Sequence, residues 1–138
     1  MIIRDAMMGL SRFDEFLESL GISPTILSRR LKQLVESGIL NRSVSANSPV
    51  RVTYVLTERG HAFEPILLFL HSFGNKHFLP EGETAVVVNR QTGASTDLCI
   101  VDRVSGQKVS WPEFFVEPGP AAKDPIRAKL SYAKRKLG

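Results

Sequence analysis

Cysteine is almost absent from this sequence, which contains only Cys99 among 138 residues. A lone cysteine excludes a disulfide framework within the chain and a zinc site built from a cysteine cluster. Cys99 lies between Leu98 and Ile100, so we expect a buried, unreactive side chain that packs like a small apolar residue. Redox sensing through a disulfide would therefore require a second chain.

Long apolar runs are missing as well. No stretch approaches the roughly 20 apolar residues that cross a bilayer, and the charged residues Arg4 and Asp5 lie where a signal peptide would have its apolar segment. We therefore expect a cytoplasmic protein without membrane contact. Hydrophobic residues make up 43% and charged residues 23% of the chain, as in ordinary globular proteins, and its length favours one domain with a small appendage.

Motifs of catalysis and metal binding are also lacking. His61, His71 and His77 do not have metal-ligand spacing, so we expect them at the surface or facing a partner subunit. No serine, histidine and aspartate occur in a nucleophile motif, and Gly93 and Gly106 are single turn glycines outside any phosphate-binding loop. The sequence therefore predicts a protein that is not an enzyme and has no cofactor and no metal.

What the chain does have is an uneven distribution of basic residues. Residues 1–79 hold nine Lys and Arg against seven Asp and Glu, residues 80–122 three against six, and residues 123–138 six against one. The charged residues in the segment 23–51 are almost all basic. They are Arg29, Arg30, Lys32, Arg42 and Arg51, with Glu36 as the single acid. Nucleic-acid binding needs such local basic surface. Composition also predicts two parts, a domain over 1–79 and an extension over 80–138.

Two short helices are predicted near the N-terminus. Apolar residues recur on one helical face at Phe13, Phe16, Leu17 and Leu20, and again at Leu27, Leu31, Leu34 and Val35. Ser11 and Asp14 form a capping-box pattern for the first helix. Ser23 is a good N-cap for the second, Pro24 suits its first position, and Gly38 is suited to end it. Two short helices with a four-residue link predict a helix-turn-helix.

A β-hairpin and a longer helix are predicted next. Residues 39–44 and 50–56 have strand character, and residues 46–49 supply turn residues, so this hairpin is positioned as the wing of a winged helix. Thr57 is expected to cap one helix that runs through Phe73. That helix is apolar over more than one stripe, so we expect a second copy of the chain to cover it. The expected dimer residues are Phe63, Ile66, Leu67, Leu70 and Phe73.

The last third contains a short internal repeat. At an offset of 13 residues, Val88, Arg90 and Gly93 match Val101, Arg103 and Gly106, which predicts a small antiparallel meander of strands and glycine turns. Three aromatic residues, Trp111, Phe114 and Phe115, are interpreted as the core of a small C-terminal unit rather than as the wall of a ligand pocket. Residues 126–137 could form a helix but have only a weak apolar face, so from Pro118 onward we expect a mobile basic tail.

The predicted second helix has a polar face that could read DNA. In a helix-turn-helix this helix lies in the major groove. Helical spacing places Thr25, Arg29 and Lys32 near the centre of the face opposite the leucines. Arg29 is suited to a guanine, Thr25 and Ser28 to versatile hydrogen bonds, and Arg30 and Lys32 to phosphates. The expected DNA-binding residues are Arg12, Ser23, Thr25, Ser28, Arg29, Arg30, Lys32 and, in the wing, Arg51.

The alternative is that this polar face has no binding function and is an ordinary solvated surface, which most helices have. Taken alone, a polar face favours that alternative. The helix caps, the helical spacing, the wing and the clustered basic charge occur together here, and their combination favours DNA binding.

Several segments resemble a known family. In order, they are Arg12-Phe13-Asp14-Glu15-Phe16, Leu20-Gly21-Ile22-Ser23-Pro24, Leu27-Ser28-Arg29-Arg30-Leu31, Ser37-Gly38-Ile39-Leu40 and Tyr54-Val55-Leu56-Thr57-Glu58-Arg59-Gly60. As a set, they resemble the HxlR family of bacterial, MarR-like winged-helix transcription regulators over roughly residues 1–79. The resemblance implies a homodimeric DNA-binding regulator whose second helix reads DNA and whose long apolar helix helps to form the dimer.

The chain departs from that family in two respects. Members usually have an additional N-terminal helix, often preceded by a cysteine, whereas this sequence starts at what resembles the following helix, residues 2–8. Cysteine-based sensing is therefore not carried over to this chain. The second departure is the extension after Pro80, whose role the resemblance does not supply.

These observations predict an α+β fold, with a winged helix-turn-helix of three helices and a hairpin wing, plus a small C-terminal antiparallel β unit. The expected function is a sequence-specific transcription regulator that binds a pseudo-palindromic site on double-stranded DNA as a homodimer. The alternative is a winged-helix protein-interaction module whose basic tail supplies non-specific nucleic-acid affinity. A small-molecule effector is compatible with either function, and the sequence identifies none.

Overall fold

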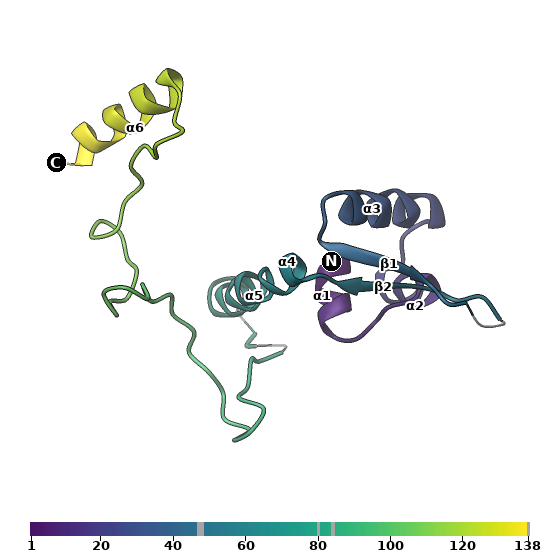
Figure 1. Cartoon of the computed structure of the whole chain (residues 1–138). Coiled ribbons are helices and arrows are strands. Elements are labelled where there is room, and N and C mark those ends of the chain that lie inside the picture. The colour runs from purple at the N-terminus through teal and green to yellow at the C-terminus, as the bar shows by residue number, and fades with distance from the viewer. Residues whose placement is uncertain (47–48, 80, 84, 138) are drawn as a thin grey trace. The chain divides into compact units, whose positions relative to one another are not determined.

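The computed structural model describes residues 1–46, 49–79, 81–83 and 85–137. In chain order the elements are α1 (Ile2–Met7), α2 (Phe13–Leu20), α3 (Pro24–Glu36), β1 (Leu40–Val44), β2 (Val52–Leu56), α4 (Glu58–His61), α5 (Glu64–Phe78) and α6 (Asp124–Leu137) (Figure 1). The chain packs as two units, Met1–Thr96 and Asp97–Gly138. This packing boundary lies later in the chain than the change in composition near residue 80.

The core of the first unit is small and joins its helices to the hairpin. The buried apolar side chains are Ile2 of α1, Phe16 of α2, Leu27 and Leu31 of α3, and Leu40 of β1. Around them lie half-buried apolar residues from the same elements and from β2. Burial of apolar surface is the main stabilising contribution to such a fold. The fold class is therefore confirmed: helices and an antiparallel hairpin form a winged helix-turn-helix.

The start of α2 lies one residue later than its capping pattern predicts. Arg12 is the N-cap, and a Glu15 carboxylate oxygen accepts hydrogen bonds from the backbone N–H groups of Ser11 (2.8 Å) and Arg12 (2.9 Å). These donors lower the pKa of Glu15 because they stabilise its ionised form. The predicted pairing of Ser11 with Asp14 is wrong, since Asp14 instead forms an ion pair with the Arg12 guanidinium.

Helix α3 begins and ends as its sequence predicts. The hydroxyl oxygen of Ser23 accepts a hydrogen bond from the Ile26 N–H at 3.4 Å, and Pro24 occupies the first turn. After the C-cap Ser37, Gly38 adopts a φ of 71°, a left-handed conformation that glycine reaches without a steric penalty. These local signals place α3 directly between the helix-turn-helix link and the wing.

The hairpin is confirmed with one continuous register. Strands β1 and β2 pair antiparallel from Leu40 opposite Leu56 to Val44 opposite Val52. The turn expected at residues 46–49 includes residues 47–48, which lie outside the described residues.

The single helix expected from Thr57 through Phe73 is wrong, because the structure divides it into α4 and α5. The N-cap role of Thr57 is confirmed, since its Oγ1 accepts a hydrogen bond from the Gly60 N–H at 3.1 Å. The break falls at Ala62 and Phe63, just before Pro65 in the first turn of α5. Proline has no N–H to continue a helical ladder, and it is tolerated only in a first turn.

The 13-residue repeat is present in three dimensions as two similar turns. Isolated antiparallel bridges join Val88 to Ser95 and Val101 to Lys108. The Asn89 side chain accepts backbone hydrogen bonds in the first turn, and Asp102 does so 13 residues later. The structure therefore confirms antiparallel pairing, but each turn has a single bridge where we expected a meander of extended strands.

Several expectations for the extension are wrong. Residues 124–137 form helix α6, the alternative that the weak apolar face of this segment had ranked second. Trp111 and Phe115 are 60% and 45% exposed, so they are not the core of a C-terminal unit, and Phe114 is half-buried. Cys99 is exposed rather than buried. In the part of the chain that the structure describes, no helix has the length and apolar character that a membrane crossing requires.

Candidate nucleic-acid interface

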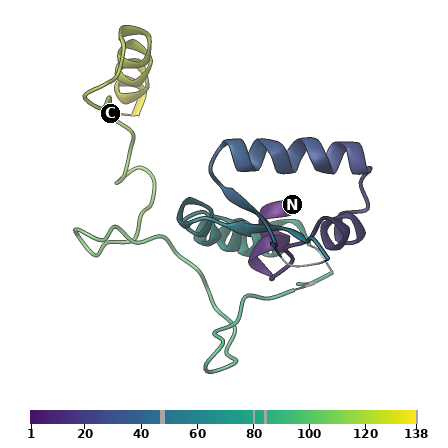
Figure 2. The same cartoon turned by 45° about the vertical axis from the view of Figure 1, so that its right-hand side comes forward.

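Helix α3 has one face in the core and one face in solvent. Leu27 and Leu31 are buried against the other elements. The side chains expected to read DNA, namely Ser23, Thr25, Ser28, Arg29, Arg30 and Lys32, are all exposed. Figures 1 and 2 show α3 along the edge of the first unit, with its outer side free of the other elements. The predicted separation of an apolar face and a polar face is therefore present in the fold.

The charge on this outer face is largely uncompensated. Within the described part of the chain, neither Arg29 nor Arg30 has an ion pair or a side-chain hydrogen bond. Lys32 Nζ lies 3.8 Å from Glu36 Oε1, and both side chains are more than half exposed. Such an exposed pair contributes little to stability, so Lys32 can exchange Glu36 for another anion at small cost. The face offers three cations to an anionic partner.

The C-terminal end of α3 is held by residues that the sequence analysis did not assign to the site. Thr57 Oγ1 donates to the carbonyl oxygen of Gly38 at 2.6 Å, and Arg59 Nη1 donates to the carbonyl oxygen of Ser37 at 2.9 Å. These bonds satisfy carbonyl groups at the helix end that have no partner inside the helix. No local sequence signal could reveal them, because donor and acceptor are about 20 residues apart. They tie the end of α3 to the start of α4.

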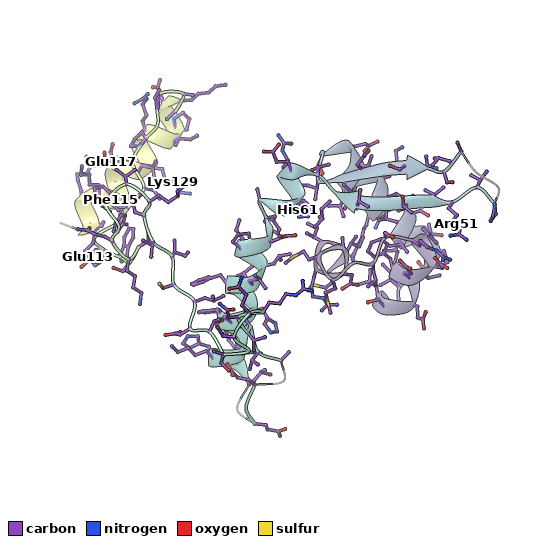
Figure 3. The ribbon with its side chains drawn as sticks, turned by 60° about the horizontal axis from the view of Figure 1, so that its bottom comes forward. Arg51, His61, Glu113, Phe115, Glu117 and Lys129 are labelled. Carbon is purple, nitrogen blue, oxygen red and sulfur yellow. The ribbon has the colours of Figure 1, made fainter. Side chains whose placement is uncertain are left out.

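The wing carries its basic residues in solvent. Arg51 lies at the end of the hairpin that is remote from α4 (Figure 3) and is exposed. Arg42 on β1 pairs in register with Tyr54 and is exposed as well. Val44 and Val50 near the tip are 51% and 70% exposed. The wing therefore presents two guanidinium groups to solvent beside apolar side chains.

Two of the expected DNA-binding residues have structural contacts of their own. The guanidinium of Arg12 is bound to the Asp14 carboxylate. The hydroxyl oxygen of Ser23 caps α3, although a hydroxyl that accepts one hydrogen bond can still donate another. Ser23 can therefore serve both purposes, whereas Arg12 would first have to leave Asp14.

Helix α5 presents the apolar side chains that were expected to form a dimer. Ile66, Leu70 and Phe73 are 50%, 56% and 47% exposed, and Phe63 and Leu67 are half-buried. A large set of exposed apolar side chains on one helix is typical of an interaction surface.

The three histidines lie at the surface, as expected. His61 Nδ1 lies 2.8 Å from Glu64 Oε1, and His71 Nε2 lies 2.9 Å from the Ala85 carbonyl oxygen. The ring of His77 packs against Phe73, with ring centroids 4.7 Å apart. Each ring therefore has a local neighbour.

Comparison with known proteins gives consistent matches. The HxlR-like helix-turn-helix family matches residues 1–82. An uncharacterized HTH-type transcriptional regulator of Mycobacterium tuberculosis is 31% identical over 132 residues, which cover 95% of this chain and 81% of that protein. The HTH-type transcriptional regulator YodB of Bacillus subtilis is 35% identical over 85 residues, covering 61% of this chain and 75% of YodB.

Solved structures are similar over most of the chain. A candidate transcription factor from Pseudomonas aeruginosa, PA1374, is 38% identical with a TM-score of 0.69, covering 94% of this chain and 88% of that chain. A second candidate transcription factor, PA1607, is 31% identical with a TM-score of 0.75, covering 84% of this chain and 82% of that chain. The named relatives are transcription regulators rather than enzymes.

Proposed function

The chain belongs to the HxlR-like helix-turn-helix family and is a transcription regulator with a DNA-binding fold; from this premise we propose that it binds a pseudo-palindromic operator as a homodimer, with α3 in the major groove. The observation that carries the proposal is the outer face of α3. This face is exposed, its arginines are unpaired within the described residues, and the helix is capped at both ends. Because the partner is chromosomal DNA, we place the protein in the cytoplasm.

The proposal assigns different tasks to the residues of α3 and the wing. Arg29 forms a bidentate pair with a guanine, and Thr25 and Ser28 donate to or accept from neighbouring base edges. Lys32 near the centre of the outer face and Arg30 at its flank contact phosphates, as does Arg51 in the wing. Ser23 adds a hydroxyl donor near the helix start. Arg12 contributes only if a phosphate replaces Asp14 as its partner.

A gel-shift titration with the DNA upstream of the protein's own gene tests these tasks. Arg29→Ala should lose preference for the operator over unrelated DNA, because one bidentate base contact supplies about 1–3 kcal/mol of discrimination. Arg51→Ala should weaken binding to the operator and to unrelated DNA alike. It should also reduce the salt dependence of binding by the amount expected for the loss of about one phosphate contact. Arg103→Ala, which removes an exposed arginine of the second unit, is the control. Equal losses of preference in the two test variants would contradict the assigned roles.

The proposed dimer uses the exposed side of α5. Ile66, Leu70 and Phe73 supply its apolar surface, with Phe63 and Leu67 at the edge that borders α1 and α3. Operators with two half-sites match a protein with twofold symmetry. Leu70→Glu places a charge on this surface without disturbing the core, since Leu70 is 56% exposed. Light scattering should then show a monomer. An unchanged dimer would exclude this side of α5.

A second candidate function rests on α6. This helix and Lys123 before it carry six basic side chains, and Lys134 pairs with Glu117. If the winged helix is instead a protein-interaction module, the basic helix supplies the nucleic-acid affinity. Deletion of residues 123–138 would then abolish a steep salt dependence and leave no sequence preference. Retained operator preference after the deletion favours α3.

A further inference from the structure

A cavity of about 500 Å³ lies between α1, α3 and the first turns of α5, within the first unit. Its walls include the apolar side chains of Ile3, Leu34, Phe63 and Leu67. Pockets for small organic ligands are typically about 300–1,000 Å³, largely apolar, with a few polar groups that fix orientation. The cavity has the size and the lining of such a pocket.

The charged side chains of this cavity are cationic. Arg4 and Arg30 line it beside the neutral polar residues Gln33 and Ser37, and among the described residues no aspartate or glutamate does. Arg4 is neutralised in part, because its guanidinium lies 2.7 Å from the buried Asp5 carboxylate. Within the described residues, Arg30 has no such partner. An apolar cavity with one uncompensated guanidinium is complementary to an apolar molecule that carries a single negative charge.

We propose that this cavity binds an aromatic monocarboxylate, with its ring among Leu34, Phe63 and Leu67 and its carboxylate on Arg30. The planar guanidinium matches a carboxylate with two parallel hydrogen bonds, and such charge-assisted pairs are strong. Phe63 offers an aromatic face for the ring. Naphthalene-sized acids fit within the stated volume.

The site gives the ligand a direct route to DNA binding, a consequence that rests on the function proposed above. Arg30 belongs to α3, where we assign it to a phosphate. A guanidinium engaged by a ligand carboxylate inside the cavity is not available to that phosphate. Ligand and DNA are therefore antagonists, and each lowers the affinity for the other by the same factor. If the protein is a repressor, the ligand therefore releases it from DNA and acts as an inducer. If the protein is an activator, the ligand releases it in the same way and ends activation.

Calorimetry on the full chain, without DNA, tests the site itself. Titration with 2-naphthoate should give saturable binding, and the neutral isostere 2-naphthamide should bind about tenfold or more weakly, because it lacks the charge that Arg30 pairs with. Arg30→Gln should abolish the preference for the acid. Arg29→Gln removes the neighbouring arginine, which does not line the cavity, and should leave naphthoate affinity within about twofold.

Three results would overturn the proposal: no saturable binding of naphthoate to the wild-type chain, equal binding of acid and amide, or equal effects of the two arginine variants. Leu67→Glu provides an independent variant, since a carboxylate on the cavity wall should repel naphthoate while circular dichroism reports whether the chain is folded. Undiminished naphthoate binding by folded Leu67→Glu would also overturn it.

A gel shift separates failure of the site from failure of the proposed function. Naphthoate should weaken operator binding by the wild type and have no effect on whatever binding Arg30→Gln retains. If the wild type binds no DNA, the proposed function fails and calorimetry alone still decides the site. If DNA binding is specific but naphthoate does not bind, the site fails alone.

Discussion

Replacement of Gly60 by alanine should destabilise the first unit, although alanine is the better helix former. Gly60 is buried in α4, where a Cβ would overlap the carbonyl oxygen of Ile39 and lie 2.8 Å from Leu56 Cδ2. That carbonyl accepts hydrogen bonds from Thr57 N (3.0 Å) and Thr57 Oγ1 (3.2 Å). Relief of the overlap must move backbone atoms that connect the wing to α4.

The expected cost follows from these contacts. Overpacking of a tight site costs about 1–3 kcal/mol, and weakening one hydrogen bond to the Ile39 carbonyl adds about 0.5–1.5 kcal/mol. Alanine regains up to about 1 kcal/mol of helix propensity. With the full propensity gain subtracted, the net loss in the free energy of unfolding is therefore about 0.5–3.5 kcal/mol. For a unit of this size, each kcal/mol lowers Tm by about 4–8 °C.

Gly74 in α5 is the matched control, because among the described residues no atom outside its chain neighbours and the nearby backbone of its own helix lies within 4 Å of a Cβ built there. Gly74→Ala should stabilise by about 0.4–1 kcal/mol, mainly by restricting the unfolded chain. Urea and thermal unfolding of both variants at two chain concentrations supplies the measurement, since contacts between copies near Gly74 would make its effect depend on concentration. A Gly60→Ala chain as stable as wild type, or equal signs for the two variants, would refute the reasoning.

Two further predictions concern the residues that support α3 and α2. Thr57→Val keeps the shape of the side chain but removes the hydroxyl that caps α4 and bonds Gly38, so the free energy of unfolding should fall by about 1–2 kcal/mol in denaturant melts; an unchanged midpoint would contradict both contacts. Glu15 has a lowered pKa in the folded chain, so its charge stabilises the fold above its ordinary pKa, and this contribution is lost as pH falls through the folded pKa. The free energy of unfolding of wild type should therefore exceed that of Glu15→Gln by a constant amount near neutral pH. Urea titrations under acidic conditions should show this difference shrink, whereas a pH-independent difference would argue against a role of the charge.

Features that depend on near neighbours in the chain could be predicted well. Ser23, Pro24 and Gly38 delimit α3 because helix caps act over three or four residues. The spacing of Leu27 and Leu31 is enough to separate its core face from its outer face. These two properties also locate the candidate interface, since the exposed face of α3 contains the cationic residues.

Choices between neighbouring residues were harder to predict. Ser11 was expected to begin α2, but the N-cap is Arg12, and the carboxylate of Glu15 accepts hydrogen bonds from the backbone N–H groups of both Ser11 and Arg12. The apolar pattern after Thr57 continues through the break before Pro65, so periodicity alone indicated one helix where there are two. Local propensities differ by less than the energies of the tertiary contacts that decide such cases.

The amino-acid pattern by itself determined the succession of α2, α3, β1 and β2, the two faces of α3 and the 13-residue spacing of the C-terminal turns, because each depends on bonds and contacts a few residues apart. Only the tertiary structure decided that Thr57 and Arg59 hold the end of α3, that Arg30 lines a cavity, and that Trp111 and Cys99 are exposed. Burial and long-range hydrogen bonds depend on which segments meet in space, and the apolar character of a residue does not specify its neighbours.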